Sequence, residues 1–381
     1  MFNFSRENTG LVAKWWRNID KQILFIFVFL LLLGLFFSFS STTSMMSEKM
    51  NKQTYFFFIK HLIFVSISLF LLIAISIQEK NKLIKFLIYL FLVSIVLLLL
   101  TLVVGVEIKG SKRWMGFDPL PRFQPVELVK PLFIIFVAKI IVLNEKANIY
   151  RRYLYSFLVL LLIVIILINQ PDLGQTLLLA SVWITMVFVS GFDMVILLIL
   201  GLAFLSIITL LIFFFPEKFS YVFLRIKTFM DPKAGDNFQS QKALDAIKQG
   251  GLTGQGMGEG ILKDEVPEAH TDYIIAVVSE EFGAIFVLFI VTIFLFIGYK
   301  VFNKVFSEKN EFLKLALVGL VSLLIIQTFI HIGVNTRLLP TTGMTLPFLS
   351  YGGSSLIGSS IIAGIILNFT RKDSARYSEN D

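Results

Sequence analysis

The chain contains 381 residues, of which 56% are hydrophobic and 16% are charged, and its formal net charge is +8. A soluble domain carries about 25% charged residues, so this composition excludes a water-soluble fold and predicts that most of the chain is solvated by lipid. The lack of cysteine excludes disulfides and thiol catalysis, no nucleotide-binding fingerprint is present, and the positive charge is typical of membrane topology rather than of a nucleic-acid partner.

Ten apolar runs follow one another along the chain, each close to the roughly 20 residues that cross a bilayer. They predict an all-α fold, a polytopic protein with about ten transmembrane helices in a single membrane domain, residues 1–381. The first run follows basic residues, as in a signal peptide, but the further runs favour an uncleaved helix. The predicted spans are 22–41, 55–78, 84–106, 126–144, 154–168, 175–190, 194–215, 272–299, 313–333 and 351–370.

Short segments rich in Lys and Arg set the predicted orientation, because such segments stay in the cytoplasm. With ten spans they all fall on one side, so we expect a cytoplasmic N-terminus (1–21), a ten-helix core (22–370) and a cytoplasmic tail (371–381). Loop 107–125 and the long loop 216–271, between helices 7 and 8, then lie outside the cytoplasm. The other basic segments on the cytoplasmic side are 79–83, 145–153 and 300–312.

Two charged residues open the fourth span. Glu127 and Lys130 are three positions apart, so they share a helix face and can pair. Charges at this depth are costly unless they are paired or face a wet cavity. The pair is therefore either a structural lock between helices or part of a functional site. Upstream, Arg113 and Trp114 combine a cation with an amphipathic ring, a pattern that is also typical of an interfacial anchor.

The outer loops after the fifth and seventh spans carry further candidates. In the turn 169–174, Asp172 is expected to act as a turn or cap residue. Residues 221–232 predict an amphipathic helix on the membrane that offers Arg225 to anions, and a second short helix begins near Lys242. The glycines of 250–260 predict either a flexible link or backbone that approaches a substrate closely or moves.

The long loop ends at the start of the eighth span, where Thr271 or Asp272 is expected to cap the helix. Glu280 and Glu281 follow within that span and need partners at such a depth. The last outer segment, 335–355, is irregular, and such backbone survives near a membrane only when it is buried in protein or lines a watery cavity. Its Gly352-Gly353-Ser354 end can present backbone N–H groups to an anion.

Four blocks of this sequence resemble the signatures of the FtsW/RodA/SpoVE (SEDS) family of peptidoglycan glycosyltransferases, from about residue 20 to 370. Within the family, 342–347 resembles the cell-division branch more than the elongation branch. Pro131 and the Glu259-Gly260 pair depart from the usual pattern. The blocks are Ser111-Lys112-Arg113-Trp114 with Gln124-Pro125-Val126-Glu127, Asn169-Gln170-Pro171-Asp172-Leu173-Gly174, Pro267-Glu268-Ala269-His270-Thr271-Asp272-Tyr273, and Leu346-Pro347-Phe348-Leu349-Ser350-Tyr351-Gly352-Gly353-Ser354-Ser355.

The resemblance implies polymerisation of lipid II into a β-1,4 glycan at the outer face of the cytoplasmic membrane, with inversion at the anomeric carbon. Asp272 matches the aspartate expected to act as catalytic base. Guanidinium and ammonium groups are expected to hold pyrophosphate, and these are Arg113, Lys130, Arg225 and Arg337. The other expected substrate-binding residues are Trp114, Glu127, Lys242, His270, Thr271, Ser350, Tyr351, Gly352, Gly353 and Ser354.

The same resemblance implies a class B penicillin-binding protein and other divisome membrane proteins as partners, at the division septum. It also allows a divalent cation, Mg²⁺ or Mn²⁺, near Asp272, although the sequence supplies no full ligand set. Two other functions compete: a flippase for lipid II and a non-catalytic scaffold. The clustering of polar residues at the outer ends of the spans favours the enzyme, because a flippase needs a hydrophilic path through the membrane centre.

Overall fold

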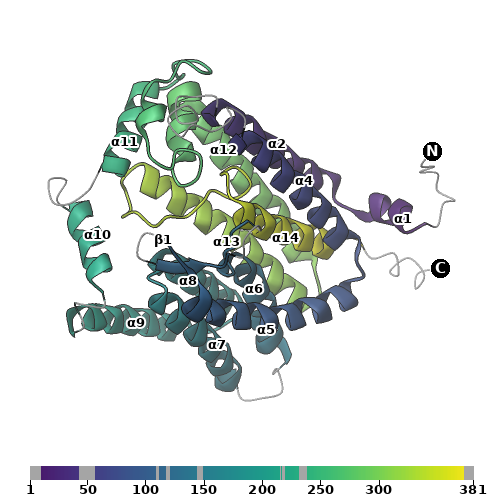
Figure 1. Cartoon of the computed structure of the whole chain (residues 1–381). Helices are drawn as coiled ribbons and strands as arrows, with labels where there is room; N and C mark the ends of the chain where they lie inside the picture. The colour runs from purple at the N-terminus through teal and green to yellow at the C-terminus, as the bar shows by residue number, and fades with distance from the viewer. Residues whose placement is uncertain are drawn as a thin grey trace.

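A computed structural model describes residues 10–42, 56–108, 111–116, 121–143, 149–214, 216, 219–230 and 238–372. Within these residues, ten long helices match the ten predicted spans one to one, which confirms the all-α membrane fold (Figure 1). The helices are α2 (Lys21–Thr42), α4 (Phe56–Ile77), α5 (Lys80–Val104), α6 (Val126–Leu143), α7 (Ile149–Asn169), α8 (Leu173–Val189), α9 (Met194–Phe214), α12 (Ile274–Ser307), α13 (Glu311–Asn335) and α14 (Gly353–Thr370).

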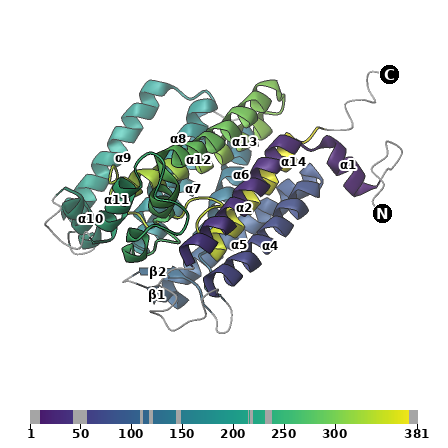
Figure 2. The same ribbon diagram turned by 90° about the horizontal axis from the view of Figure 1, so that it is seen from above.

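Seven helices of the described chain are long and apolar enough to cross a membrane: α2, α4, α5, α7, α12, α13 and α14. α8 is apolar but has 17 residues. α6 carries Glu127, Lys130 and Lys139, yet it packs against α5, α13 and α14 rather than standing alone in lipid. Figure 2 shows α14 beside α2 and α4, and 89% of its apolar window is buried inside the protein. α13 and α14 therefore form the centre of the bundle.

The outer segments are more ordered than the sequence indicates. In loop 107–125, β1 (Val106–Ile108) pairs antiparallel with β2 (Ser111–Trp114), which places Trp114 opposite Val106. The expected amphipathic helix and the second short helix are present as α10 (Ser220–Met230) and α11 (Phe238–Gly250), followed by the 3₁₀ turn η1 (Leu262–Glu265). Figure 1 shows α10 and α11 on the same side of the bundle.

Two segments predicted to be cytoplasmic contain more helix than expected. α12 continues to Ser307 and α13 begins at Glu311, so the predicted connection 300–312 is wrong and only 308–310 join the two helices. The apolar run ends near residue 299, but the following polar residues are compatible with helix, and the helix continues through them. Before α2, part of the basic N-terminal segment forms α1 (Leu11–Asn18), which the sequence analysis did not predict.

α12 is broken at Gly283, whose backbone is non-helical at φ 81° and ψ 173°. The glycine-rich segment 250–260 packs on this break, because a Cβ on Gly283 would lie 2.2 Å from the Leu252 carbonyl oxygen. Four hydrogen bonds replace those that the helix loses at the break. These run from Gln255 N to Glu280 O (2.8 Å), Gly256 N to Glu281 O (3.0 Å), Ala284 N to Gly251 O (3.0 Å) and Ile285 N to Leu252 O (3.2 Å).

Close approach of one backbone to another explains Gly250 and Gly254, whereas Gly251, Gly256 and Gly258 have positive φ. A Cβ on Gly254 would lie 2.2 Å from the Glu281 carbonyl oxygen, so a larger residue would separate the loop from the helix. The expected alternatives did not include this role: the backbone of the segment approaches α12 of the same protein, and its approach to a substrate stays a prediction. The long outer loop is thereby anchored to the helix that begins next to Asp272.

Candidate active site

Three donors from the last outer segment and from α13 hold three successive carbonyl groups just before α12. Successive fixed carbonyls define the peptide planes of this segment and with them the direction in which its side chains leave the backbone. The hydrogen bonds are Tyr351 N to His270 O (2.8 Å), Ser350 Oγ to Thr271 O (2.7 Å) and Asn335 Nδ2 to Asp272 O (3.0 Å).

Asp272 lies at the end of this clamped segment but does not cap the helix. The N-cap of α12 is Tyr273, and no side-chain cap hydrogen bond is made there, so the expectation that Thr271 or Asp272 caps α12 is wrong. Thr271 instead donates its hydroxyl to the backbone and side chain of Glu268, at 3.2 and 3.0 Å. The Asp272 carboxylate, which is partly exposed, lies beside Gly343: its Oδ2 is 3.5 Å from the position that a Cβ on Gly343 would take.

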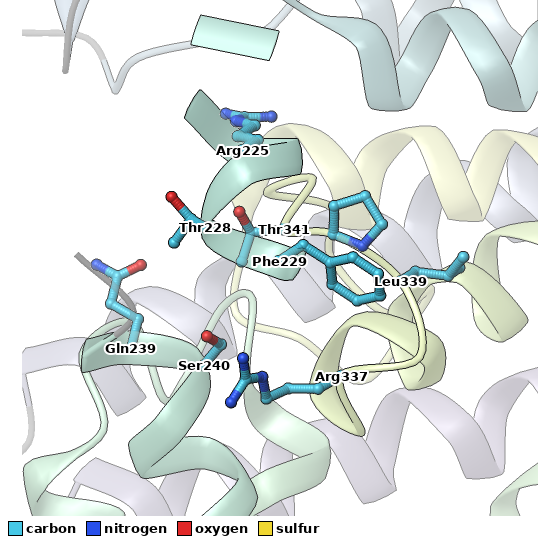
Figure 3. Close-up of a pocket in the computed structure, with 9 residues that line it drawn as sticks. Arg225, Thr228, Phe229, Gln239, Ser240, Arg337, Leu339 and Thr341 are labelled. Atoms are coloured by element: carbon cyan, nitrogen blue, oxygen red, sulfur yellow. The ribbon is translucent and has the colours of Figure 1, made fainter. Parts of the chain in front are cut away.

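A pocket with two arginines opens between the outer helices (Figure 3). Arg225 comes from α10, and Arg337 comes from the turn after α13, where its φ is 56°. Arg337 donates to Gln241 Oε1 at 2.9 Å, which holds its guanidinium against α11. The rest of the wall is mixed, with hydroxyl and amide groups beside three apolar residues, and the two guanidinium groups suit it to an anionic head group. The remaining lining residues are Thr228, Phe229, Gln239, Ser240, Leu339, Pro340 and Thr341.

The Tyr273 phenol connects this pocket electrostatically with Asp272. Burial raises the pKa of Tyr273, the charge of Asp272 raises it further, and the charge of Arg225 lowers it. A carboxylate and a guanidinium therefore both act on one hydroxyl, and their effects on its pKa are opposite in sign. The candidate base and one wall of the arginine pocket consequently belong to the same outer region of the protein.

An aromatic cluster covers the other side of the clamped segment. The His270 ring lies 5.0 Å from Phe57 and 5.6 Å from Tyr351 between ring centroids, and Tyr351 lies 5.7 Å from His61. Burial lowers the pKa of His270, opposed in part by Glu268, and burial raises the pKa of Tyr351. With its pKa lowered, His270 is mostly neutral at pH 7 and serves as a packing residue in this cluster rather than as a cation for phosphate.

Arg113 contacts protein rather than the pocket of Figure 3. Its Nε donates to Gln170 O at 3.1 Å, a terminal nitrogen donates to Pro171 O, and Nε lies 3.6 Å from the Asp172 carboxylate. Asp172 caps α8 by accepting from Gln175 N at 3.4 Å, which confirms the cap expected there. The guanidinium thus secures the α7–α8 turn, a structural role that differs from the expected pyrophosphate contact.

Glu127 and Lys130 form the expected ion pair, and it is buried. Lys130 Nζ lies 2.9 Å from a Glu127 oxygen, and the two side chains are 2% and 5% exposed. Lys130 also donates to Gln327 Oε1 at 3.1 Å, and Gln327 donates to Thr345 O at 2.9 Å. The structural alternative is therefore the one that this geometry supports, because the pair joins α6 to α13 and supports the last outer segment from beneath.

The remaining expected residues also have protein contacts. Lys242 pairs with Glu265, and its ammonium lies 5.7 Å from the Phe238 ring centroid. At the start of α14, Gly352 is the N-cap, and a Cβ on Gly353 would lie 2.5 Å from the Phe64 ring. Ser354 Oγ accepts from Gln124 N at 3.1 Å. These three positions shape the junction of α4, α6 and α14.

The described residues do not form a complete ligand set for a divalent cation. Among the described residues, no group of three or more His, Cys, Asp or Glu side chains is arranged to hold a metal. A hard cation such as Mg²⁺ or Mn²⁺ prefers several oxygen ligands, and Asp272 has no second carboxylate in such a group. The site residues therefore do not fit the metal that the resemblance allows.

The sequence analysis missed three residues that shape the site and its surroundings: Asn335, Lys263 and Gly283. Asn335 ends an apolar helix, Lys263 lies in a long loop, and Gly283 lies within a span, so none has a local pattern that indicates a partner. Glu281 offered the best signal, since a carboxylate at that depth needs a partner. Its partners are Lys263, Ser40 and the N–H of Gly258, the last at 3.2 Å.

Comparison with known proteins identifies similar chains across nearly the whole length. The FtsW/RodA/SpoVE family model, described as "Cell cycle protein", matches residues 21–375. The probable peptidoglycan glycosyltransferase FtsW of Caulobacter vibrioides is 35% identical over 279 residues, covering 72% of this chain and 69% of that protein. The protein of the same name from Geobacter metallireducens is 37% identical over 275 residues, covering 71% and 72%.

Solved structures give the same result for the fold. A chain from a peptidoglycan synthase complex, described as coordinating polymerisation and crosslinking, superposes with a TM-score of 0.76 at 26% identity. The alignment covers 92% of this chain and 97% of that one. The rod shape determining protein RodA of Thermus thermophilus superposes with a TM-score of 0.69 at 25% identity, covering 93% and 97%.

Proposed function

Because the chain belongs to the FtsW/RodA/SpoVE family of cell cycle proteins, we propose that it is a peptidoglycan glycosyltransferase that polymerises lipid II during septal cell-wall synthesis. The observation that carries the proposal is the clamped Asp272, with a pocket that contains two arginines in the same outer region of the protein. Fixed carbonyls on three successive residues orient the segment of the candidate base. Such preorganisation is what general-base and electrostatic catalysis require.

The proposed reaction is a single inverting displacement. The 4-hydroxyl of the acceptor GlcNAc attacks the anomeric carbon of the donor MurNAc, and the Asp272 carboxylate accepts the hydroxyl proton. As the new C–O bond forms, the bond to undecaprenyl pyrophosphate breaks, and the leaving group departs with the electron pair and its negative charge. Arg225 and Arg337 supply guanidinium donors for that charge. The proposed reaction includes no step that depends on a metal ion, because the residues of the site do not fit one.

The setting of the reaction is also proposed. The chain is a multi-pass membrane protein, and the basic short segments support a bacterial cytoplasmic membrane with residues 216–271 outside the cytoplasm. The arginine pocket then faces the side on which glycan strands are assembled. Since a structurally similar chain belongs to a peptidoglycan synthase complex, we propose a class B penicillin-binding protein as the partner, with other divisome membrane proteins and no nucleic acid.

The direct test is polymerisation of lipid II by purified protein, with and without its cognate class B penicillin-binding protein. Glycan chains resolved by length are expected from the complex. A reconstituted liposome assay with labelled lipid II separates the flippase alternative, because a flippase moves the lipid between leaflets without forming polymer. Transbilayer movement without any polymer would overturn the proposed function. The absence of both movement and polymer would also overturn it and would support the scaffold alternative.

A further inference from the structure

Asn335 uses both polar atoms of its side chain, Oδ1 and Nδ2, in hydrogen bonds near the start of α12. It is the last residue of α13, and it is 0% exposed. Its Oδ1 accepts from Ala276 N at 3.2 Å, and its Nδ2 donates to Asp272 O at 3.0 Å and to His331 O at 2.9 Å. A buried amide with all of these bonds formed has one orientation, because any rotation would leave several buried groups unpaired.

The Ala276 N–H belongs to the first turn of α12, where donors lack the usual helical partner four residues earlier, and it donates to the Tyr273 carbonyl oxygen at 3.0 Å. An N-cap side chain normally accepts from this position, but Tyr273 provides no such bond. Asn335 supplies a second acceptor for this N–H, a side-chain oxygen from a different helix. The same amide group holds the carbonyl of Asp272, so it fixes the start of the helix and the residue before it with respect to α13.

From this geometry we propose that Asn335 is a positioning residue for Asp272 in the reaction proposed above, on which the inference rests. The carbonyl that it holds belongs to Asp272 itself, whereas Ser350 and Tyr351 hold the two residues before it. Loss of the Nδ2 donor frees the Asp272 peptide plane to rotate. The carboxylate then moves with its Cα–Cβ bond, and a displacement of about 1 Å in a reacting group costs on the order of 10²-fold in rate.

Asn368 provides a matched control on the opposite end of the bundle. It is also 0% exposed, and its Nδ2 donates to three carbonyls at the end of α4, those of Ile75, Ser76 and Gln78. Removal of either side chain deletes buried hydrogen bonds at a helix end, so both variants should lose stability. Of the two asparagines, only Asn335 contacts Asp272. Only the removal of Asn335 should therefore slow the reaction catalysed by folded protein.

Two substitutions at residue 335 separate positioning from capping. Asn335→Ala removes both functions, while Asn335→Asp keeps an acceptor for Ala276 N and caps as well as Asn but, when ionised, cannot donate to the Asp272 carbonyl. The experiment measures kcat and KM for lipid II with the penicillin-binding protein present, below the unfolding temperature of each variant. Folded fractions from size-exclusion chromatography normalise kcat.

We expect Asn335→Ala and Asn335→Asp each to lower kcat about 10- to 100-fold, with KM within about threefold of wild type because the arginines are intact. Asn368→Ala is expected to keep the wild-type kcat despite a lower unfolding temperature. Recovery of kcat in Asn335→Asp, a wild-type kcat in Asn335→Ala or an equal loss in Asn368→Ala would overturn the inference and leave the proposed function intact. A wild-type complex that forms no glycan would overturn the proposed function and, with it, this inference.

Discussion

Glu281 in α12 forms a salt bridge with Lys263 of the outer loop, and the two side chains are 0% and 5% exposed. The pair lies next to the break at Gly283, where the glycine-rich segment 250–260 packs against the helix. Ser40 of α2 also donates to Glu281. One carboxylate thus joins α2, α12 and the outer loop close to the point where α12 changes direction.

The first prediction concerns this pair. Lys263→Met should destabilise the protein by about 3–5 kcal/mol, because it leaves a buried carboxylate without its cation. Lys242→Met is the control, since the Lys242–Glu265 pair is 29% and 48% exposed and such pairs contribute about 0–1 kcal/mol. Denaturant unfolding in detergent compares the two variants, and equal losses would show that burial of the Glu281 pair has no energetic consequence.

The second prediction concerns orientation. Alkaline phosphatase is active only after export, so a fusion after residue 250 should be active and a fusion after residue 309 should be inactive. The physical reason is the cytoplasmic retention of short basic segments. Both fusions are measured at matched expression. The reverse pattern would place Asp272 and the arginine pocket on the cytoplasmic side and would contradict outer-face chemistry.

The third prediction separates Arg113 from Arg225. Arg113→Ala should lower the unfolding temperature, because hydrogen bonds from a charged group are worth about 1.5–3 kcal/mol and Arg113 holds the carbonyls of Gln170 and Pro171. Arg225→Ala should mainly raise KM for lipid II. Thermal unfolding and steady-state kinetics on the same preparations test both. A raised KM with unchanged unfolding temperature in Arg113→Ala would restore the expected pyrophosphate contact.

The fourth prediction concerns pH. The pKa of His270 is lowered by burial below its ordinary value of 6.5, so the unfolded chain binds a proton at a higher pH than the folded protein does. The stability contribution is therefore complete above pH 6.5 and is lost as pH falls toward the folded pKa, by at most about 1.4 kcal/mol per pH unit.

His270→Phe should make this loss shallower, because Phe keeps the ring contacts with Phe57 and Tyr351 but cannot bind a proton. His61 and His331 are present in both proteins, so the difference between the two curves reports residue 270 together with its electrostatic effect on His61. The measurement is the free energy of unfolding between pH 7.5 and 5.5 in detergent. Parallel curves would show that His270 binds its proton equally well in both states.

The spans could be predicted from sequence because each follows from the length of one apolar run. The Glu127–Lys130 pair could also be predicted, because a spacing of three residues places both side chains on one helix face. The role of Asp172 as a cap could be predicted from the residues next to it in the chain. Each of these inferences uses residues close together in sequence. The family motifs led to Asp272 in the same way, as a contiguous block.

The contacts that position Asp272 could not be predicted, because they join distant segments. Asn335 meets Asp272 across 63 residues, and Arg113 meets Gln170 across 57. Glycine is common in membrane helices, so Gly283 gave no sign of a break. The β1–β2 hairpin is too short for an alternation of apolar residues to indicate it, and α12 extends past its apolar run through Ser307.

The catalytic role of Asp272 is tested most directly by glycan synthesis with Asp272→Asn, measured with purified lipid II and the cognate penicillin-binding protein present throughout. The amide keeps the size of the side chain, and the carbonyl held by Asn335 is unchanged, so folding should survive. Because an amide cannot accept the hydroxyl proton at neutral pH, the rate should fall by about 10²–10⁴-fold. Polymerisation by Asp272→Asn at the wild-type rate would contradict the assignment of Asp272 as the base.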